Sequence, residues 1–174
     1  MSAAAIRESA AGDGAALDRL YARAFPAEDL RPLVAALLGM DRRTVLSLVA
    51  GPPGAPTGHC VFTRCAVDDG PLDAALLGPL AVDPDRQGRG VGSALVRDGL
   101  DRLRAAGTAR VFVLGDPRYY GRFEFAPEPA VSPPCPIPDA WRPAWQSLAL
   151  AEGAPPVGPL AVPEVWRDPA LWAP

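Results

Sequence analysis

Three glycines alternate with other residues immediately before a predicted helix. They are Gly88, Gly90 and Gly92, within the segment Asp83–Ser93 (DPDRQGRGVGS). The start of a helix carries N–H groups without internal partners, and the helix dipole adds positive potential there. Glycines let a bulky anion approach those N–H groups, and Arg86 and Arg89 add positive charge. The segment therefore predicts a binding loop for a cofactor that contains a diphosphate.

Two other interpretations of this loop compete with a coenzyme A site. A glycine-rich turn without a ligand is the simplest, but alternate glycines with two arginines exceed what a turn requires. A nicotinamide or flavin nucleotide site gains support from Asp116, an acidic residue after the next predicted strand. Its glycine pattern, however, needs a third Gly at a spacing that is not met after Ser93. The loop also follows three predicted strands rather than the first one.

Composition excludes several classes of function. The net charge is −3, which does not favour DNA or another polyanion as a partner. The chain has no Lys, which rules out a Lys-dependent phosphate loop, a Schiff base and a Ser–Lys dyad. No run of eighteen apolar residues predicts a membrane span, and Met1–Arg7 lacks the features of a secretory signal. We therefore expect a cytoplasmic protein that binds neither nucleic acid nor membrane.

Three cysteines and one histidine are further groups that could take part in chemistry. Cys60, Cys65 and Cys135 are odd in number and lack CxxC spacing, so we expect structural thiols in a reducing compartment. No cluster of His, Cys and carboxylates has ligand spacing, so no metal is expected. His59 lies on a predicted strand, where it is either a proton acceptor or an ordinary strand residue. The general base stays unassigned.

The elements that must position the loop follow from periodicity. We predict a strand over 4–9, a helix from an N-cap at Asp13 to about residue 25, and a helix over 30–38. Strands over 44–50, 58–67 and 73–82 follow, joined by turns as in an antiparallel meander. Gly78-Pro79 is expected to interrupt the third strand, because Pro cannot donate to a ladder.

The second half begins with a predicted helix over 91–106, which ends at Gly107. A strand over 109–114 follows, and this strand–helix–strand order implies a parallel pair. A short helical segment over 118–122, a strand that begins over 123–125 and a last strand over 146–150 complete the prediction. The Pro-rich segment 126–174 holds all four Trp residues, so we expect it to pack on the domain.

The loop and its surroundings resemble the GNAT superfamily of N-acetyltransferases. Residues 87–92 (QGRGVG) match the superfamily motif Q/R-x-x-G-x-G/A, and 77–84 and 114–123 look like its bacterial YhbS-like branch. The resemblance is strong over 74–130, whereas the N-terminal half agrees in element order only. It implies one domain over 1–174 with a mixed α/β fold. The expected sheet is twisted and mostly antiparallel, with a central parallel pair and helices on both faces.

The resemblance also implies a reaction. Acetyl-CoA is the expected co-substrate, and its acetyl group passes to an amine by direct attack in a ternary complex. Implied cofactor-binding residues are the strand residues that pair with the pantetheine arm and the loop residues that hold the diphosphate: Leu80, Ala81, Val82, Gln87, Gly88, Arg89, Gly90, Val91, Gly92 and Ser93. The splayed strand at Gly78-Pro79 supports this, since parted strands leave free amide groups.

Tyr120 aligns with a Tyr of the superfamily that protonates or hydrogen-bonds the leaving thiolate, and it is the implied catalytic residue. Glu124 departs from the pattern, which usually has Gly there, and a positive φ would strain it. A non-catalytic acyl-CoA-binding or interaction module of the same fold is the alternative. The acceptor is left open among small amines, antibiotics, amino acids, peptides and protein termini, and a homodimer is among the oligomeric states left open.

Overall fold

The computed structural model describes residues 5–173, and the contacts divide the chain into two compact units. Unit 1 consists of residues up to Phe62 together with Gly78–Arg102, and unit 2 of Thr63–Leu77 together with the residues from Leu103 on. Two strands and one helix contribute residues to both units. The single domain expected over 1–174 stays a prediction. No helix within 5–173 is long and apolar enough to cross a membrane.

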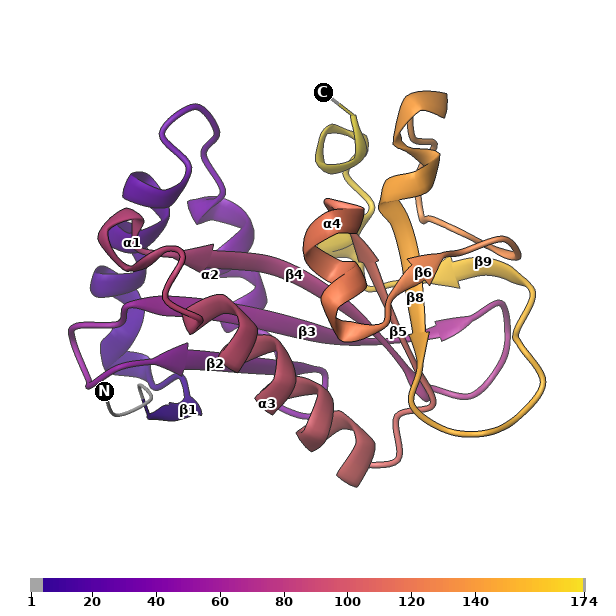
Figure 1. The fold of residues 1–174 in the computed structure, drawn as a ribbon, viewed down its shortest axis with the longest axis horizontal. Coiled ribbons are helices and arrows are strands. Elements are labelled where there is room, and N and C mark those ends of the chain that lie inside the picture. Colours follow the sequence, from indigo (N-terminus) through magenta and orange to yellow (C-terminus); the bar gives the residue numbers. More distant parts are fainter. Residues whose placement is uncertain (1–4, 174) are drawn as a thin grey trace. The chain divides into compact units, whose positions relative to one another are not determined.

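Unit 1 contains four strands in the order β1-β2-β3-β4 (Figure 1). β1 (Ile6–Glu8) pairs antiparallel with β2 (Val45–Ala50), and β3 (Gly58–Val67) and β4 (Ala74–Val82) follow. The three predicted strands of the meander are thus confirmed. The first predicted strand is shorter than expected, and Ala4 lies outside the described residues. β4 is continuous through Gly78, which has a φ of 147° and a cis bond to Pro79, so the strand itself is not interrupted as predicted. Its pairing with β5 (Arg110–Leu114), however, ends at Leu77, directly before this glycine.

Helices cover both faces of the unit 1 sheet, as the alternation along β3 shows. His59 faces α1 (Gly14–Ala24), because its ring lies against Tyr21. The neighbouring positions Gly58 and Phe62 face the opposite way, toward α3 (Val91–Ala105). A Cβ at Gly99 would overlap the Phe62 ring, so this glycine permits the close approach of α3 to the strand. In Figure 1, α3 accordingly crosses in front of β2.

The core of unit 1 lies between the sheet and the helices α1 and α2 (Arg31–Leu38). Both helices have the apolar spacing that predicted them. The buried residues of this cluster are Leu17, Leu20, Tyr21, Val34, Val49 and Ala81. Asp13 precedes α1 as predicted, but its carboxylate does not cap the helix. It is buried and paired with Arg7 at 2.8 Å, which ties β1 to the start of α1.

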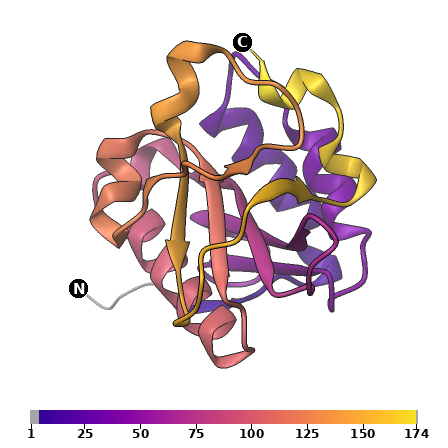
Figure 2. The same ribbon diagram turned by 90° about the vertical axis from the view of Figure 1, so that its right-hand side faces the viewer.

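Unit 2 is built around β5 (Arg110–Leu114), which pairs parallel with the first half of β4. This confirms the predicted parallel pair in a mostly antiparallel sheet. β8 (Trp145–Ala149) pairs antiparallel with β5 and with β6 (Ala126–Pro127). In Figure 2 the orange strand β8 runs beside β5. β7 (Val131–Ser132) and β9 (Gly158–Ala161) form a second short parallel pair, and β9 also pairs with β3.

The C-terminal segment packs through its tryptophans. Trp145 stacks on Phe112 of β5 at 5.7 Å, and Trp172 meets the edges of Trp145 and Trp166. The indole N–H groups find partners: Trp145 donates to the Val131 carbonyl and Trp172 to the Trp166 carbonyl. Aromatic rings of this size dominate a small core once their polar atoms are satisfied, so segment 126–173 is an integral part of unit 2.

Between β5 and β6 the chain is helical where a strand was predicted. α4 (Pro117–Tyr120) is capped by Asp116, which accepts the Arg118 N–H, and a 3₁₀ turn over Gly121–Phe123 continues it. Glu124 then adopts the left-handed conformation at φ 71°. The prediction that a strand begins over 123–125 was therefore wrong, since the helical turn extends to Phe123.

Candidate cofactor site

The predicted phosphate loop connects β4 to α3 in unit 1. After Val82 a 3₁₀ turn spans Pro84–Arg86, and the backbone reaches the helix at Val91. Asp83 begins the turn: its N–H donates to the Thr57 carbonyl at 2.9 Å, and its side chain accepts the Asp85 N–H at 2.9 Å. The start of the loop is thus fixed to the residue that precedes β3 on one side and to its own turn on the other.

Arg23, near the end of α1, holds this turn from outside. Its guanidinium donates to Asp83 at 2.6 Å and to Asp85 at 2.9 Å. Both contacts are at the surface, and the two carboxylates raise the pKa of Arg23, with Asp85 as the larger cause. No sequence pattern pointed to Arg23, because sixty residues separate it from Asp83 and only the tertiary fold brings them together.

Two glycines give the loop its path. Gly88 and Gly90 have φ of 69° and 82°, a region that other residues rarely adopt. A Cβ at either position would point into open space, so nothing of the protein fills the side from which a ligand would approach. The Ala94 N–H donates to the Gly90 carbonyl, which makes Gly90 the N-cap of α3. By helix geometry the N–H groups of Gly90, Val91, Gly92 and Ser93 have no intrahelical acceptor.

A pocket of about 850 Å³ lies beside this helix start. Gly90, Val91 and Ala94 form one wall, and the turn Gly51–Pro53 with β1 forms another. Arg86 and Arg89 line it and are exposed. Arg7 also lines it, but its charge is balanced by Asp13. The unpaired amide protons, the two exposed arginines and the unobstructed glycines fit a diphosphate.

The other predicted cofactor residues differ in how exposed they are. Ala81 is buried in the core cluster, whereas Leu80 and Val82 are half-buried at the end of β4. The Gln87 side chain donates to the Val82 carbonyl at 3.2 Å and so closes the loop onto the strand end. Gln87 thus has a structural contact that its place in the motif did not reveal, and it belongs to the same turn as Asp83.

Tyr120, the predicted catalytic residue, belongs to unit 2. It is buried at the end of α4, where its ring meets Phe125 edge-on at 5.8 Å and Tyr119 at 5.0 Å. A Cβ at Gly115 would overlap the Tyr120 ring, so this glycine leaves the space that the ring occupies. Tyr120 and the phosphate loop thus lie in different units, and the role of Tyr120 at the thioester stays a prediction.

His59 is fully buried and lies between two hydroxyl groups. Its Nδ1 is 2.8 Å from the Tyr21 hydroxyl, and its Nε2 is 2.7 Å from the Ser47 hydroxyl. Burial lowers the pKa of His59 from 6.5 to about 4, so the ring is neutral at pH 7. The structure thus makes His59 a neutral member of the unit 1 core, which is one of the two alternatives for this residue.

Within residues 5–173, no group of three or more His, Cys, Asp or Glu side chains is placed to hold a metal ion. The three cysteines carry free thiols and are buried. Burial raises the pKa of Cys65 to about 12 and raises that of Cys60 even further, so neither is a nucleophile at neutral pH.

Comparison with known proteins gives one consistent result. The model of the acetyltransferase (GNAT) family matches residues 15–125. An uncharacterised N-acetyltransferase of Escherichia coli K12, YjhQ, is 39% identical over 145 residues, which is 79% of this chain and 80% of that protein. The E. coli N-acetyltransferase YhbS is 37% identical over 114 residues, which is 65% of this chain and 68% of that protein.

Solved structures extend the similarity to the whole fold. YhbS from E. coli in complex with CoA has a TM-score of 0.83 at 30% identity and covers 97% of this chain and 94% of its own. A GNAT family acetyltransferase from Brucella melitensis in complex with acetyl-CoA has a TM-score of 0.73 at 30% identity, covering 92% and 96%. The family match over more than half of the chain, together with these relatives, shows that the chain belongs to the acetyltransferase (GNAT) family of acyltransferase enzymes.

Proposed function

We propose that this protein transfers the acetyl group of acetyl-CoA to the amine of an acceptor, by direct attack within a ternary complex. The observation that carries the proposal is the helix start at Gly90. Free N–H groups and two exposed arginines lie there, beside glycines whose missing side chains leave the space around them unobstructed. The complexes of YhbS with CoA and of the Brucella enzyme with acetyl-CoA support it.

The cofactor-binding residues that we propose divide by the part of the ligand that they meet. The backbone of Leu80, Ala81 and Val82 would pair with the amide groups of the pantetheine arm. The diphosphate would take the N–H groups at the loop and helix start, and we assign this role to Gln87, Gly88, Arg89, Gly90, Val91, Gly92 and Ser93. Charge-assisted hydrogen bonds from Arg89 and the helix dipole favour a doubly negative group there.

The chemistry follows from what a thioester needs. Acetyl-CoA supplies an acyl group already activated for attack. A backbone N–H such as that of Val82 would stabilise negative charge as it develops on the acyl oxygen. Tyr120 would donate a hydrogen bond or a proton to the leaving sulfur. Because a phenol (pKa ~10) is a weaker acid than a thiol (pKa ~8.5), the main contribution of Tyr120 would be the hydrogen bond. The amine must lose a proton, since a simple amine is only about a thousandth neutral at pH 7.

We place the reaction in a reducing compartment, the cytoplasm. Three free, buried thiols support this, because an oxidising compartment favours paired cysteines. The acceptor is an amine, and nothing in the described site favours a nucleic acid or a lipid surface.

Binding of CoA to the loop is tested by calorimetric titration of the wild type and two matched variants. Gly90→Asp places a negative side chain where the diphosphate would lie. Gly107→Asp is the control, because Gly107 has nearly the same φ, 85° against 82°, and equally open space around its Cβ, but lies at the other end of α3. We expect Gly90→Asp to abolish binding and Gly107→Asp to retain it. Equal affinity in all three proteins would refute the site.

Turnover separates an enzyme from a binding module of the same fold. Release of CoA thiol is measured with acetyl-CoA and a panel of small amines, amino acids and peptides. We expect acceptor-dependent release that falls about ten- to a hundredfold in Tyr120→Phe, the effect of losing one hydrogen bond to a negatively charged atom. Tyr119→Phe, the neighbouring ring, serves as the control. CoA binding without turnover on any amine class would identify the non-catalytic module instead.

A further inference from the structure

A second pocket in unit 1 has a different character from the one beside the loop. It has a volume of about 410 Å³, within the range of about 300–1,000 Å³ typical of small-molecule sites. It opens between the end of β1, the start of β2 and the C-terminal end of α2. None of the residues from 80 to 93 lines it.

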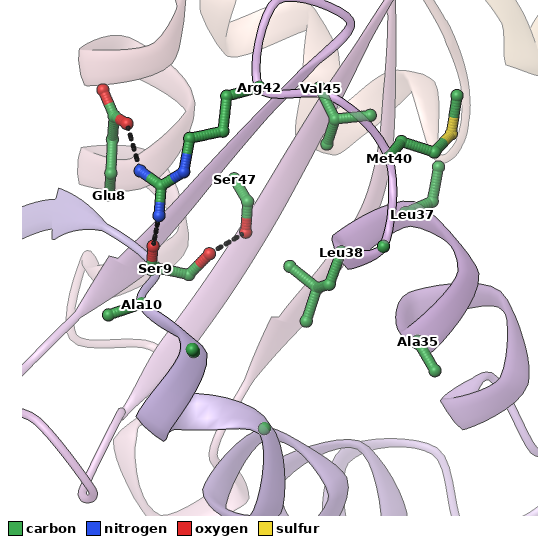
Figure 3. A pocket seen from close by; sticks show the side chains of 13 residues that line it. Glu8, Ser9, Ala10, Ala35, Leu37, Leu38, Met40, Arg42, Val45 and Ser47 are labelled. Atoms are coloured by element: carbon green, nitrogen blue, oxygen red, sulfur yellow. Dashed lines mark hydrogen bonds and ion pairs between the residues drawn. The ribbon is translucent and has the colours of Figure 1, made fainter.

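The walls of this pocket are apolar on one side and polar on the other. Leu37 and Leu38 at the end of α2, and Met40 just after it, lie to one side in Figure 3. The hydroxyls of Ser9 and Ser47 face each other on the other side. These hydroxyl oxygens are 2.7 Å apart. A ligand that fits therefore needs an apolar body and a polar group that meets the two serines.

The charges at the rim cancel. Glu8 pairs with Arg42 at 3.3 Å, and Arg42 also donates to the Ser9 carbonyl (Figure 3). Arg102, 3.6 Å from Glu8, does not line the pocket, and its charge is balanced by its own ion pair with Asp98. The Ser47 hydroxyl continues into the core to His59, which is neutral at pH 7. Because the polar wall carries no net charge, an ionic ligand would lose its hydration without gaining a counterion.

A chain of four groups ends at the pocket: Tyr21, His59, Ser47 and Ser9. A neutral imidazole has one N–H and one bare nitrogen, so the chain can run in two senses. With the proton on Nδ1, Ser47 donates to Nε2 and Ser9 donates to Ser47, so that Ser9 offers lone pairs to the pocket. With the proton on Nε2 every bond reverses, and Ser9 offers its O–H. This hydrogen-bonded series can thus adapt to a ligand that donates a hydrogen bond to Ser9 or to one that accepts a hydrogen bond from it.

We propose that this pocket binds a small uncharged molecule with an aliphatic body and one hydroxyl or amide group, which hydrogen-bonds to Ser9 and packs against Leu38 and Met40. The site is separate from the acetyl-CoA loop, and the proposal does not depend on the acetyltransferase activity.

The chain offers a selective reporter for the test. It has two methionines, Met1 and Met40, and one histidine. Protein labelled with [methyl-¹³C]methionine is titrated with 1-hexanol and hexanamide, and with hexylamine and hexanoate as charged counterparts. We expect a saturable shift of the Met40 methyl signal with the uncharged probes and weaker binding of both charged ones. A change in the imidazole ¹⁵N shifts of His59 on binding would report a change of its tautomer and hence a reversal of the hydrogen bonds that lead to Ser9.

Variants separate binding in the pocket from unspecific contact. Ser9→Ala removes the terminal hydroxyl and should weaken binding about three- to tenfold, the value of one hydrogen bond. Ser132→Ala, an exposed serine on β7, is the matched control and should bind like the wild type. Leu38→Phe narrows the pocket without touching the chain of four groups, and should abolish the Met40 shift even if Ser9→Ala is unstable.

The proposal is overturned if the Met40 signal does not move with any uncharged probe up to its solubility. It is also overturned if Leu38→Phe leaves the binding intact, or if the charged probes bind as tightly as the uncharged ones. Unchanged affinity in a folded Ser9→Ala protein would remove Ser9 from the site.

Discussion

The guanidinium of Arg23 lies 2.6 Å from the carboxylate of Asp83, and through this contact helix α1 holds the first turn of the phosphate loop. Asp83 is fully engaged, since its other oxygen accepts the Asp85 N–H and its own N–H donates to Thr57. Arg23 also reaches Asp85 at 2.9 Å. It thereby lowers the negative charge of the two carboxylates that precede the proposed diphosphate site from −2 to −1. It also restrains the backbone that leads to Gly88 and Gly90.

Arg23→Ala is therefore expected to weaken acetyl-CoA binding more than it weakens the fold. Removing the arginine makes the charge of this group more negative by one unit near an anion site and loosens the turn. Exposed ion pairs contribute little to stability, so the melting temperature should change little. We expect the Kd for acetyl-CoA to rise about three- to thirtyfold, measured calorimetrically, with a larger effect at low ionic strength.

Arg31→Ala provides the matched comparison for Arg23. Arg31 forms an ion pair of similar exposure, at 2.7 Å, but with Asp29 on its own segment. Its loss should leave the affinity for acetyl-CoA unchanged. If both variants bind like the wild type, Arg23 has no part in positioning the loop.

The geometry of the loop over 83–93 was predictable because its signals are local, whereas its role in binding a phosphate stays a prediction. Glycine at positions of positive φ, a helix N-terminus and nearby arginines lie within ten residues, as 83–93 shows. Most helices and strands were found for the same reason, from apolar periodicity. The contacts of Arg23 and the path Ser9–Ser47–His59–Tyr21 join residues that are far apart in sequence. The sequence around these residues contains no pattern that indicates such a contact.

The local errors have local causes. A strand was expected to begin over 123–125, but Asp116 caps α4 and a 3₁₀ turn continues the helix to Phe123. Asp13 was expected to cap α1, but the buried pairing with Arg7 uses its carboxylate. For Asp13 the tertiary contact with Arg7 took the place of the expected cap.

The burial of His59 predicts a pH dependence of stability. Its pKa is about 4 in the folded protein and 6.5 when exposed, so the unfolded chain binds one more proton between these values. The stabilisation is therefore complete above pH 6.5 and is lost as the pH falls toward 4, by up to ~3 kcal/mol. His59→Gln cannot titrate in this window. The difference in unfolding free energy between wild type and His59→Gln, measured in urea, should shrink as the pH falls.

The same residue can be observed directly, because the chain has a single histidine. The ¹H–¹³C signal of its ring should not titrate near pH 6.5, and its midpoint should lie close to the onset of acid unfolding. A normal titration midpoint in the folded protein would contradict the buried contacts with Tyr21 and Ser47.

Glu124 occupies a conformation that suits glycine better. Its φ of 71° is left-handed, and its N–H donates to Gly121 in the closing turn after α4. The left-handed conformation destabilises a residue with a Cβ by about 1–2 kcal/mol, and glycine removes this strain. The greater flexibility of glycine in the unfolded chain offsets part of the gain in stability. Glu124→Gly should therefore raise the unfolding free energy by about 0.5–1 kcal/mol.

Glu152→Gly is the control for this substitution. Glu152 is exposed and does not have a positive φ, so glycine gains nothing there and should be neutral or destabilising. Chemical denaturation of both variants decides the matter. A loss of stability in Glu124→Gly would mean that its side chain contributes more than the backbone strain costs.

Gly115 controls the position of the Tyr120 ring. A Cβ at residue 115 would overlap that ring, which is held on other sides by Phe123 and Phe125. Gly115→Ala must therefore displace either the ring or the end of β5, at a cost of about 1–3 kcal/mol. Gly121→Ala, in the turn after Tyr120, has open space around its Cβ and a φ of −57°, and should fold at least as stably as the wild type.

The activity of the Gly115→Ala variant tests the catalytic role of Tyr120 while the tyrosine itself is still present. If the phenol acts on the leaving sulfur, Gly115→Ala should lower kcat toward the value of Tyr120→Phe, while the affinity for acetyl-CoA stays near that of the wild type. Adding Tyr120→Phe to Gly115→Ala should then cause little further loss, because both changes remove one interaction and their effects do not add. Additive losses would instead show that Gly115→Ala acts through the stability of unit 2. In that case the phenol would have to be assigned from Tyr120→Phe alone.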